Sequence, residues 1–110
     1  MIYKVRYSAD LMAIIAQEGI TPEEVTEAIK VIEEAAANPT KPLHLNVKQE
    51  PIRDTKDLWY RFRPSKASTY RIAYSLQRRS GYLTVEGIFR RDANTYRRIE
   101  VLFKKKGLRE

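Results

Sequence analysis

The pattern of apolar and polar positions predicts seven elements, and the first half of the chain contributes three of them. Residues 2–7 combine β-branched and aromatic side chains with basic ones, as a strand does. A short helix is expected next, because Ser8 can cap it and Gly19 can adopt the left-handed turn that ends many helices. Its inward-facing side chains would be Leu11, Met12, Ile14 and Ile15.

A second helix has the clearest start signal in the sequence. Thr21, Pro22 and Glu24 form the pattern of a capping box with proline at the first helical position. Apolar residues then recur at the spacing of one helical face until Asn38-Pro39 interrupts the pattern. That face consists of Val25, Ala28, Ile29, Ile32 and Ala36.

The second half predicts three strands and a last helix. After a weakly patterned segment, 40–57, which we interpret as a long loop, strand signals follow at 58–63, 69–76 and 82–89. The short turns between these strands indicate antiparallel neighbours. Asp92 or Asn94 can cap the final helix, and Gly107 would end it after three lysines that suit the helix dipole. Its inward side chains would be Tyr96, Ile99, Leu102 and Phe103.

These elements predict an α+β fold: an N-terminal strand, a two-helix hairpin, a three-stranded antiparallel meander that joins the first strand in one sheet, and a C-terminal helix. The 110 residues fit a single domain spanning 1–110. The sequence contains no cysteine and no apolar run of the roughly 20 residues that a membrane helix needs. We therefore expect a soluble, cytoplasmic protein without a membrane partner.

Charge is divided unequally between the two halves. Residues 1–50 hold five Lys/Arg against eight Asp/Glu, whereas residues 51–110 hold sixteen against six. In the predicted strands, alternation separates Tyr60 and Phe62 from Arg61 and Arg63, and it places Arg71 between small residues on one sheet face. Arg90 and Arg91 follow the last strand and would close the same patch at its rim. The cluster predicts a surface for the phosphodiester backbone of a nucleic acid, and a solvated sheet face is the alternative.

Two segments resemble the RelE/ParE toxin superfamily. The stretch 60–74, YRFRPSKASTYRIAY, is similar to that family's basic strand followed by a strand of the pattern Tyr-Arg-Ile-x-Tyr. The later segment 88–92, with Tyr96 after it, resembles the family's arginine-rich segment before a C-terminal tyrosine. The predicted element order also matches, so the resemblance covers nearly the whole chain.

The resemblance implies the toxin of a toxin–antitoxin pair that cleaves messenger RNA on the ribosome without a metal or other cofactor. Its partners would be a cognate antitoxin protein, messenger RNA and the ribosome. In this reading, a ribose 2′-hydroxyl attacks the adjacent phosphate, and Tyr96 or Glu86 accepts the proton. The implied catalytic residues are Arg61, Arg63, Arg71, Arg90 and Tyr96. The expected substrate-binding residues are Trp59, Lys66 and Arg91, of which Trp59 can stack on a base.

Two departures from the family pattern keep other functions open. Many relatives have histidine where this chain has Phe89, and lysine at the positions of Arg61 and Arg63. One alternative is a ParE-like gyrase inhibitor, which acts by binding a protein, and another is an inactive member that binds only nucleic acid or an antitoxin. A zinc site is not expected, because His44 is the only histidine and no cysteine accompanies it.

Overall fold

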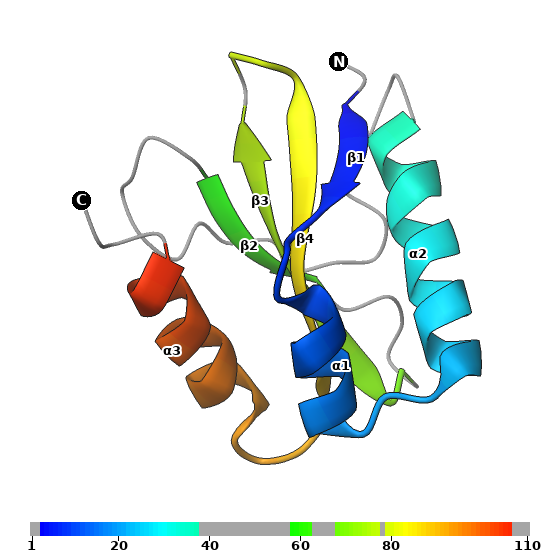
Figure 1. Ribbon diagram of the computed structural model, residues 1–110, viewed down its shortest axis with the longest axis vertical. Coiled ribbons are helices and arrows are strands. Elements are labelled where there is room, and N and C mark those ends of the chain that lie inside the picture. The colour runs from blue at the N-terminus through cyan, green and yellow to red at the C-terminus, as the bar shows by residue number, and fades with distance from the viewer. Residues whose placement is uncertain (1–2, 38–57, 63–67, 78, 107–110) are drawn as a thin grey trace.

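The computed structural model describes residues 3–37, 68–77 and 79–106 in full, and the backbone of 58–62. Its element order confirms the prediction (Figure 1). The predicted loop at 40–57, with His44, lies outside the described residues. The elements are β1 (Lys4–Tyr7), α1 (Leu11–Glu18), α2 (Pro22–Ala37), β2 (Leu58–Phe62), β3 (Tyr70–Gln77), β4 (Tyr82–Arg90) and α3 (Thr95–Lys106).

The strands form one sheet with the order β1-β4-β3-β2. The strands β2, β3 and β4 make the predicted antiparallel meander, and β1 joins it in parallel beside β4. Gly81, in the β3–β4 turn, has φ 77°, a conformation in which glycine avoids the strain that a side chain would bring. The β3–β4 register shifts between Ala73 and Tyr74, which leaves Glu86 as an extra, bulged residue in β4.

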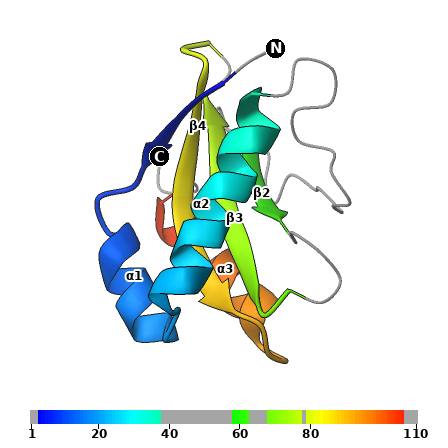
Figure 2. The same cartoon turned by 90° about the vertical axis from the view of Figure 1, so that its right-hand side faces the viewer.

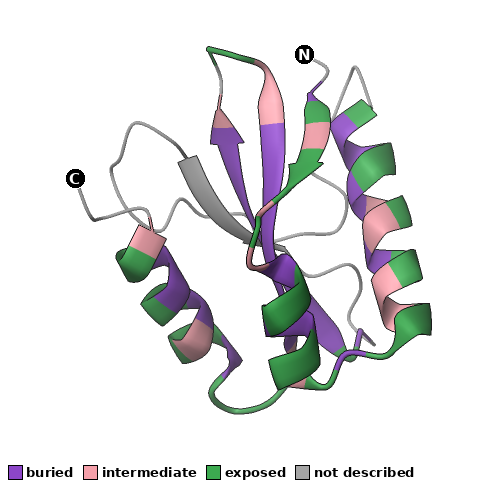
Figure 3. Cartoon of the chain, viewed as in Figure 1, coloured by how far each residue is buried: buried purple, intermediate pink, exposed green. Residues whose placement is uncertain are grey.

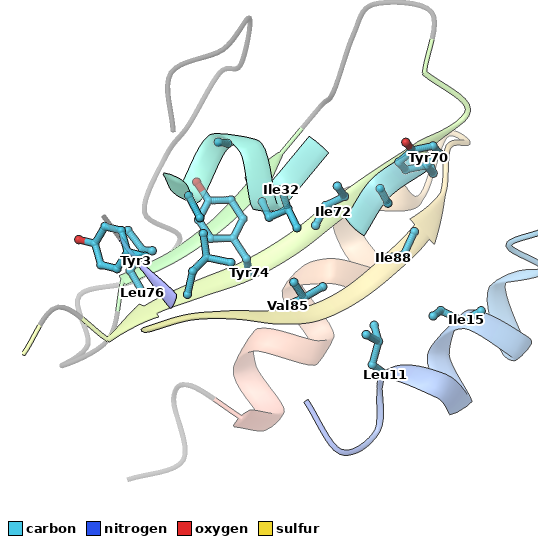
Figure 4. Packing of buried hydrophobic residues seen from close by; sticks show 14 of the residues in the cluster. Tyr3, Leu11, Ile15, Ile32, Tyr70, Ile72, Tyr74, Leu76, Val85 and Ile88 are labelled. Carbon is cyan, nitrogen blue, oxygen red and sulfur yellow. The ribbon is translucent and has the colours of Figure 1, made fainter. Parts of the chain in front are cut away.

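One face of the sheet packs against α2 and forms the larger core. Figure 2 shows α2 on one side of the sheet and α3 on the other. The alternation predicted for β3 is confirmed, because Tyr70, Ile72 and Tyr74 are fully buried on the α2 face (Figure 4). On α2, the side chain of Ile32 is only 1% exposed and contributes to this cluster. Burying such a side chain stabilises the fold by about 1.5–3 kcal/mol.

The other face of β3 and β4 is also buried, which corrects the expectation of an open, cationic sheet face. The inner face of α3 presents Ile99, Leu102 and Phe103, and these pack with Ala73 and Phe89 of the sheet. β3 and most of β4 are therefore buried along both faces (Figure 3). The alternation argument identified the two faces correctly but did not predict that the amphipathic last helix would cover the second one.

The short helix α1 lies at the end of β1 and joins the two cores. Its Leu11 and Ile15 belong to the α2-side cluster, whereas Ile14 packs with Phe89 and α3. The prediction that Met12 faces inward is wrong, because this side chain is 74% exposed. Ser8 is not the cap either: the N-cap position is Asp10, and it makes no side-chain capping bond. At the other end, Gly19 adopts the predicted left-handed conformation, with φ 68°.

Gly87 in β4 is the position where the packing of α3 can be tested most directly. A Cβ atom added there would lie 2.5 Å from Cε1 of the buried Phe89 ring and 3.4 Å from Leu102 Cδ2. We expect Gly87→Ala to lower the free energy of unfolding by about 1–3 kcal/mol, because overpacking must displace the ring or the helix. Urea unfolding followed by circular dichroism measures the change.

Gly81→Asn is the comparison variant: no atom lies within 4 Å of a Cβ placed there, so its cost is the backbone strain of the positive φ alone, which asparagine bears better than most side chains. We expect it to change stability by less than about 1 kcal/mol. Equal stability of Gly87→Ala and the unmodified protein would contradict the close packing of Phe89 and α3.

Candidate nucleic-acid site

The start of β3, the end of β4 and the first turn of α3 meet at one end of the sheet. The backbone N–H of Arg91 donates to the carbonyl of Thr69 at 3.0 Å, which fixes the β4–α3 connection against the β3 start. Four residues that the sequence predicts as functional lie here, and we call them the arginine end. They are Arg71, Arg90, Arg91 and Tyr96.

Arg71 is a buried cation at the start of β3. Its side chain is 6% exposed, and Nη1 donates to the main-chain carbonyls of Tyr70 at 2.9 Å and Ser68 at 3.3 Å. Among the described residues, no carboxylate pairs with it. The buried hydroxyl of Ser68 beside it has no hydrogen-bond partner. The hydrogen-bond donors of Arg71 and Ser68 therefore lie close together, where an anion can accept from both.

Arg90 does not join Arg71. Arg90 is the register partner of Tyr70, and Arg71 that of Phe89, so the two side chains leave opposite faces of the sheet. The guanidinium of Arg90 instead lies against α2, where Nη1 and Nη2 donate to the two carboxylate oxygens of Glu24 at 2.6 and 2.7 Å. The structure therefore separates two arginines that we expected to form one patch.

Glu24 holds three parts of the chain together. It closes the predicted capping box of α2, because the Glu24 N–H donates to Thr21 Oγ1 at 3.1 Å and its carboxylate accepts from the Thr21 N–H at 2.9 Å. The same carboxylate accepts from Arg90 and from Thr69 Oγ1. These bonds, led by the one from Arg90, hold the pKa of Glu24 well below its usual value. The sequence pattern revealed the cap but not the pairing with Arg90.

A second ion pair that the sequence reasoning missed joins α3 to α1. Nη2 of Arg98 donates to Glu18 Oε1 at 2.8 Å, and Nη1 donates to Asp92 Oδ1 at 2.9 Å. These two carboxylates raise the pKa of Arg98 above its usual value. The backbone N–H of Arg90 donates to Glu18 as well, at 2.9 Å. Glu18 and Arg98 are 80 positions apart, so no local sequence pattern marks this pair.

Glu86, one of the two expected proton acceptors, is held in a polar network. Its side chain is 6% exposed; Oε2 accepts from Ser75 Oγ at 2.7 Å, and Oε1 accepts from Lys106 Nζ at 3.0 Å. Lys106 also donates to Asp10 Oδ1 at 2.6 Å. Both carboxylate oxygens are thus engaged, and the network fastens the C-terminal end of α3 to the sheet. This geometry favours a structural role for Glu86.

Tyr96, the other expected acceptor, lies in the first turn of α3 and is 43% exposed. The prediction that it packs inward is therefore wrong, and this exposure leaves it accessible to a ligand. Arg91 is exposed next to the same turn. Tyr96 and Arg91 thus remain candidates on the surface of the arginine end.

The basic strand is described by its backbone register alone. Arg61 lies opposite Ala73, two residues along β3 from Arg71, and Trp59 lies opposite Ser75. Arg63 and Lys66 lie outside the described residues. The roles expected for these four residues stay predictions.

Neither a membrane span nor a metal cluster is found in the described part of the chain. No helix there is long and apolar enough to cross a bilayer. The same residues hold no group of three or more His, Asp or Glu side chains that could ligate a metal ion.

Comparison with solved structures identifies the fold. A chain of the archaeal RelE–RelB complex from Pyrococcus horikoshii superposes with a TM-score of 0.59 at 15% sequence identity, over 84% of this chain and 99% of that one. The sequence matches no protein-family profile. No curated protein sequence matches it either. The fold of this chain is RelE-like, as the resemblance implied.

The Glu24–Arg90 pair gives the fold a defined acid dependence. Because the pKa of Glu24 lies below its ordinary 4.5 in the folded state, its contribution is present above that pH and is lost as the pH falls below it. We expect Glu24→Gln to cost about 1–2 kcal/mol near neutral pH, and the difference from the unmodified protein to shrink toward about pH 3. Urea unfolding at several pH values measures this.

Glu23→Gln provides the matched control, because Glu23 is the exposed neighbour in the same first turn of α2. It removes one negative charge near the same helix end without touching Arg90. Identical pH profiles for the two variants would show that Glu24 acts only through the helix dipole.

Proposed function

We propose that this protein is the toxin of a toxin–antitoxin pair and that it cleaves messenger RNA on the ribosome. The RelE-like fold supports the first part of the proposal. The second part is carried by one observation, which is the state of Arg71. Arg90 and Arg98 are neutralised by carboxylates, whereas Arg71 is buried without one among the described residues.

Burying a cation without a counter-ion costs free energy, so the buried position of Arg71 favours the binding of an anion. Removing a guanidinium from water costs several kcal/mol, and the two main-chain carbonyls compensate only part of this cost. A phosphodiester supplies both the missing charge and oxygens that match the fork of donors. The unpartnered hydroxyl of Ser68 offers a further donor at the same place.

The proposed reaction forms a bond between the ribose 2′-oxygen and the adjacent phosphorus and breaks the bond to the 5′-oxygen. The products are a 2′,3′-cyclic phosphate and a 5′-hydroxyl. Arg71 would neutralise the phosphorane oxygens, the phenolate form of Tyr96 would accept the proton of the 2′-hydroxyl, and a proton from solvent would reach the 5′-oxygen. Arg61 and Arg63 would hold the neighbouring phosphates, and Arg91, Lys66 and Trp59 would bind the flanking RNA.

Two of the expected residues change roles. Arg90 is a positioning residue in this proposal, because its guanidinium is committed to Glu24 and it fixes the end of β4 that leads to Arg91 and Tyr96. Glu86 is a structural residue, because both of its oxygens are engaged. The partner protein would be an antitoxin, and a cytoplasmic location follows from a ribosomal substrate.

Arg71→Met tests the proposed phosphate contact on ribosomes programmed with a defined message. We expect single-turnover cleavage to slow by about 100-fold or more, because one preorganised charge is lost from the transition state. Arg71→Lys keeps the charge but loses the forked pair of guanidinium donors, so its cleavage rate should lie between those of Arg71→Met and the unmodified protein. Thermal unfolding of each variant separates this effect from loss of structure.

Arg79→Met is the control, because it removes an exposed arginine in the β3–β4 turn, away from the arginine end. It should cleave like the unmodified protein. If neither protein cleaves the message, while induced expression leaves messenger RNA intact and relaxes plasmid DNA, the proposal fails in favour of the ParE-like alternative.

Tyr96→Phe distinguishes a proton acceptor from a packing residue. The substitution removes only a hydroxyl from a half-exposed side chain, so stability should be unchanged. We expect the cleavage rate to fall by about 10²–10⁴-fold, the usual contribution of general acid–base catalysis.

Glu86→Gln gives the opposite expectation: it should lower stability by weakening the bonds to Lys106 and Ser75, and the folded protein should still cleave. An active Tyr96→Phe together with a stable but inactive Glu86→Gln would reverse the assignment.

A further inference from the structure

A groove of about 490 Å³ lies between α1 and α3, at the end of β4 that these two helices flank (Figure 1). Its floor is Phe89, which is buried, and its walls include Ala13 and Ile14 of α1 and Leu102 of α3. At the groove's edge, the apolar side chain of Val101 is 61% exposed. The groove is mostly apolar and does not include Arg71. The carboxylates of Asp10 and Glu18 also line it, and each is paired with a cation of α3.

Two ion pairs connect the two sides of the groove, one at each end. The helices run antiparallel, so Arg98 near the start of α3 binds Glu18 at the end of α1, at 2.8 Å. Lys106 at the end of α3 binds Asp10 just before α1, at 2.6 Å. Arg98 and Lys106 are eight positions apart on α3, which corresponds to about 12 Å along the helix axis. These ion pairs set the separation of the two helices at both ends of the groove.

The outer rim of the groove carries cations with no partner in the described part of the chain. Arg97 and Lys105 line the groove from α3, both are exposed, and neither forms an ion pair with a described residue. They stand four residues before and after Val101, so all three lie along one line of the helix surface. This line presents an apolar centre between two positive charges about 12 Å apart.

We propose that this groove is the docking site for an acidic amphipathic helix of a partner protein. Such a helix would place apolar side chains over Val101, Leu102 and Phe89 and carboxylates against Arg97 and Lys105. Helix-in-groove recognition uses this combination of apolar anchors and flanking charges. A second copy of this chain fits poorly, because two basic rims would face each other and repel.

The position of the groove connects it with the arginine end. Tyr96 precedes Arg97 on the same helical turn of α3, and Arg98 contacts the carbonyl of Arg90 at 2.9 Å. A docked helix would therefore lie beside the proposed catalytic tyrosine. The identification of this partner as the antitoxin rests on the proposed function. The groove and its charges are independent of that proposal.

A designed peptide of about five helical turns provides the probe, with leucines along one face and glutamates on both sides of it. At 12.9 kDa, the isotope-labelled protein suits amide chemical-shift mapping. We expect shifts at Ala13, Ile14, Phe89, Val101 and Leu102, and binding about tenfold or more tighter than that of an isomer in which lysines replace the glutamates. Added salt should reduce this preference.

Two matched pairs of variants locate the binding. Val101→Glu should abolish binding, whereas Met12→Glu should not, since Met12 is exposed on α1 but does not line the groove. Lys105→Glu should weaken binding about tenfold, whereas Lys104→Glu, its exposed neighbour outside the lining, should have much less effect. None of these four residues belongs to the proposed catalytic site.

Several outcomes would overturn the proposal. Equal effects within either pair, shifts that map elsewhere, or equal affinity for the two peptides would each show that the groove does not select an acidic helix. Sedimentation that shows a dimer dissociating in Val101→Glu would assign the groove to a second copy of the chain. Messenger RNA cleavage is measured separately, so loss of the proposed function with intact peptide binding, or the reverse, identifies which proposal has failed.

Discussion

The packing of α3 against the second face of the sheet is the constraint on which the rest of the structure depends. Ile99, Leu102 and Phe103 close that face over Ala73 and Phe89, and Gly87 leaves the space that the Phe89 ring occupies. Because both faces of β3 are then shielded from water, any polar group on this strand must form hydrogen bonds either within the protein or with a bound ligand. The same packing places α3 beside α1 and so creates the groove between them.

This constraint sorts the cations of the basic half into two groups. Arg90, Arg98 and Lys106 are bound to carboxylates of the acidic N-terminal half, so three cations of the basic half are paired with acids from the other half of the sequence. Arg71, Arg97 and Lys105 have no such carboxylate among the described residues. Internal pairing leaves the net charge of +7 unchanged, but it removes Arg90, Arg98 and Lys106 from the cations that are available to bind a ligand.

The sequence predicted the elements, their order and the meander, because these depend on local periodicity, capping and turns. The capping box at Thr21 and Glu24 and the left-handed Gly19 are local features, and both are confirmed. The site was predicted less well. Whether Arg90 joins Arg71 depends on which face each leaves and on Glu24, a residue far away in sequence. Local sequence patterns contain no information on such long-range pairings. For the same reason they did not predict the ion pair between Arg98 and Glu18, or that α3 covers the second face of the sheet.

The helix α3 borders three surfaces, so it is the element through which the proposed binding and the proposed catalysis would influence each other. Its inner face holds the sheet, its first turn carries Tyr96, and its outer line of Arg97, Val101 and Lys105 borders the groove. The pairs from Arg98 to Glu18 and from Lys106 to Asp10 fix the helix at both ends. A ligand in the groove can shift the position of this helix only if it binds two positions of the helix with different affinity. Because the ion pairs and the apolar contacts favour one position strongly, a docked partner would act mainly by occupying the space beside Tyr96 rather than by moving it.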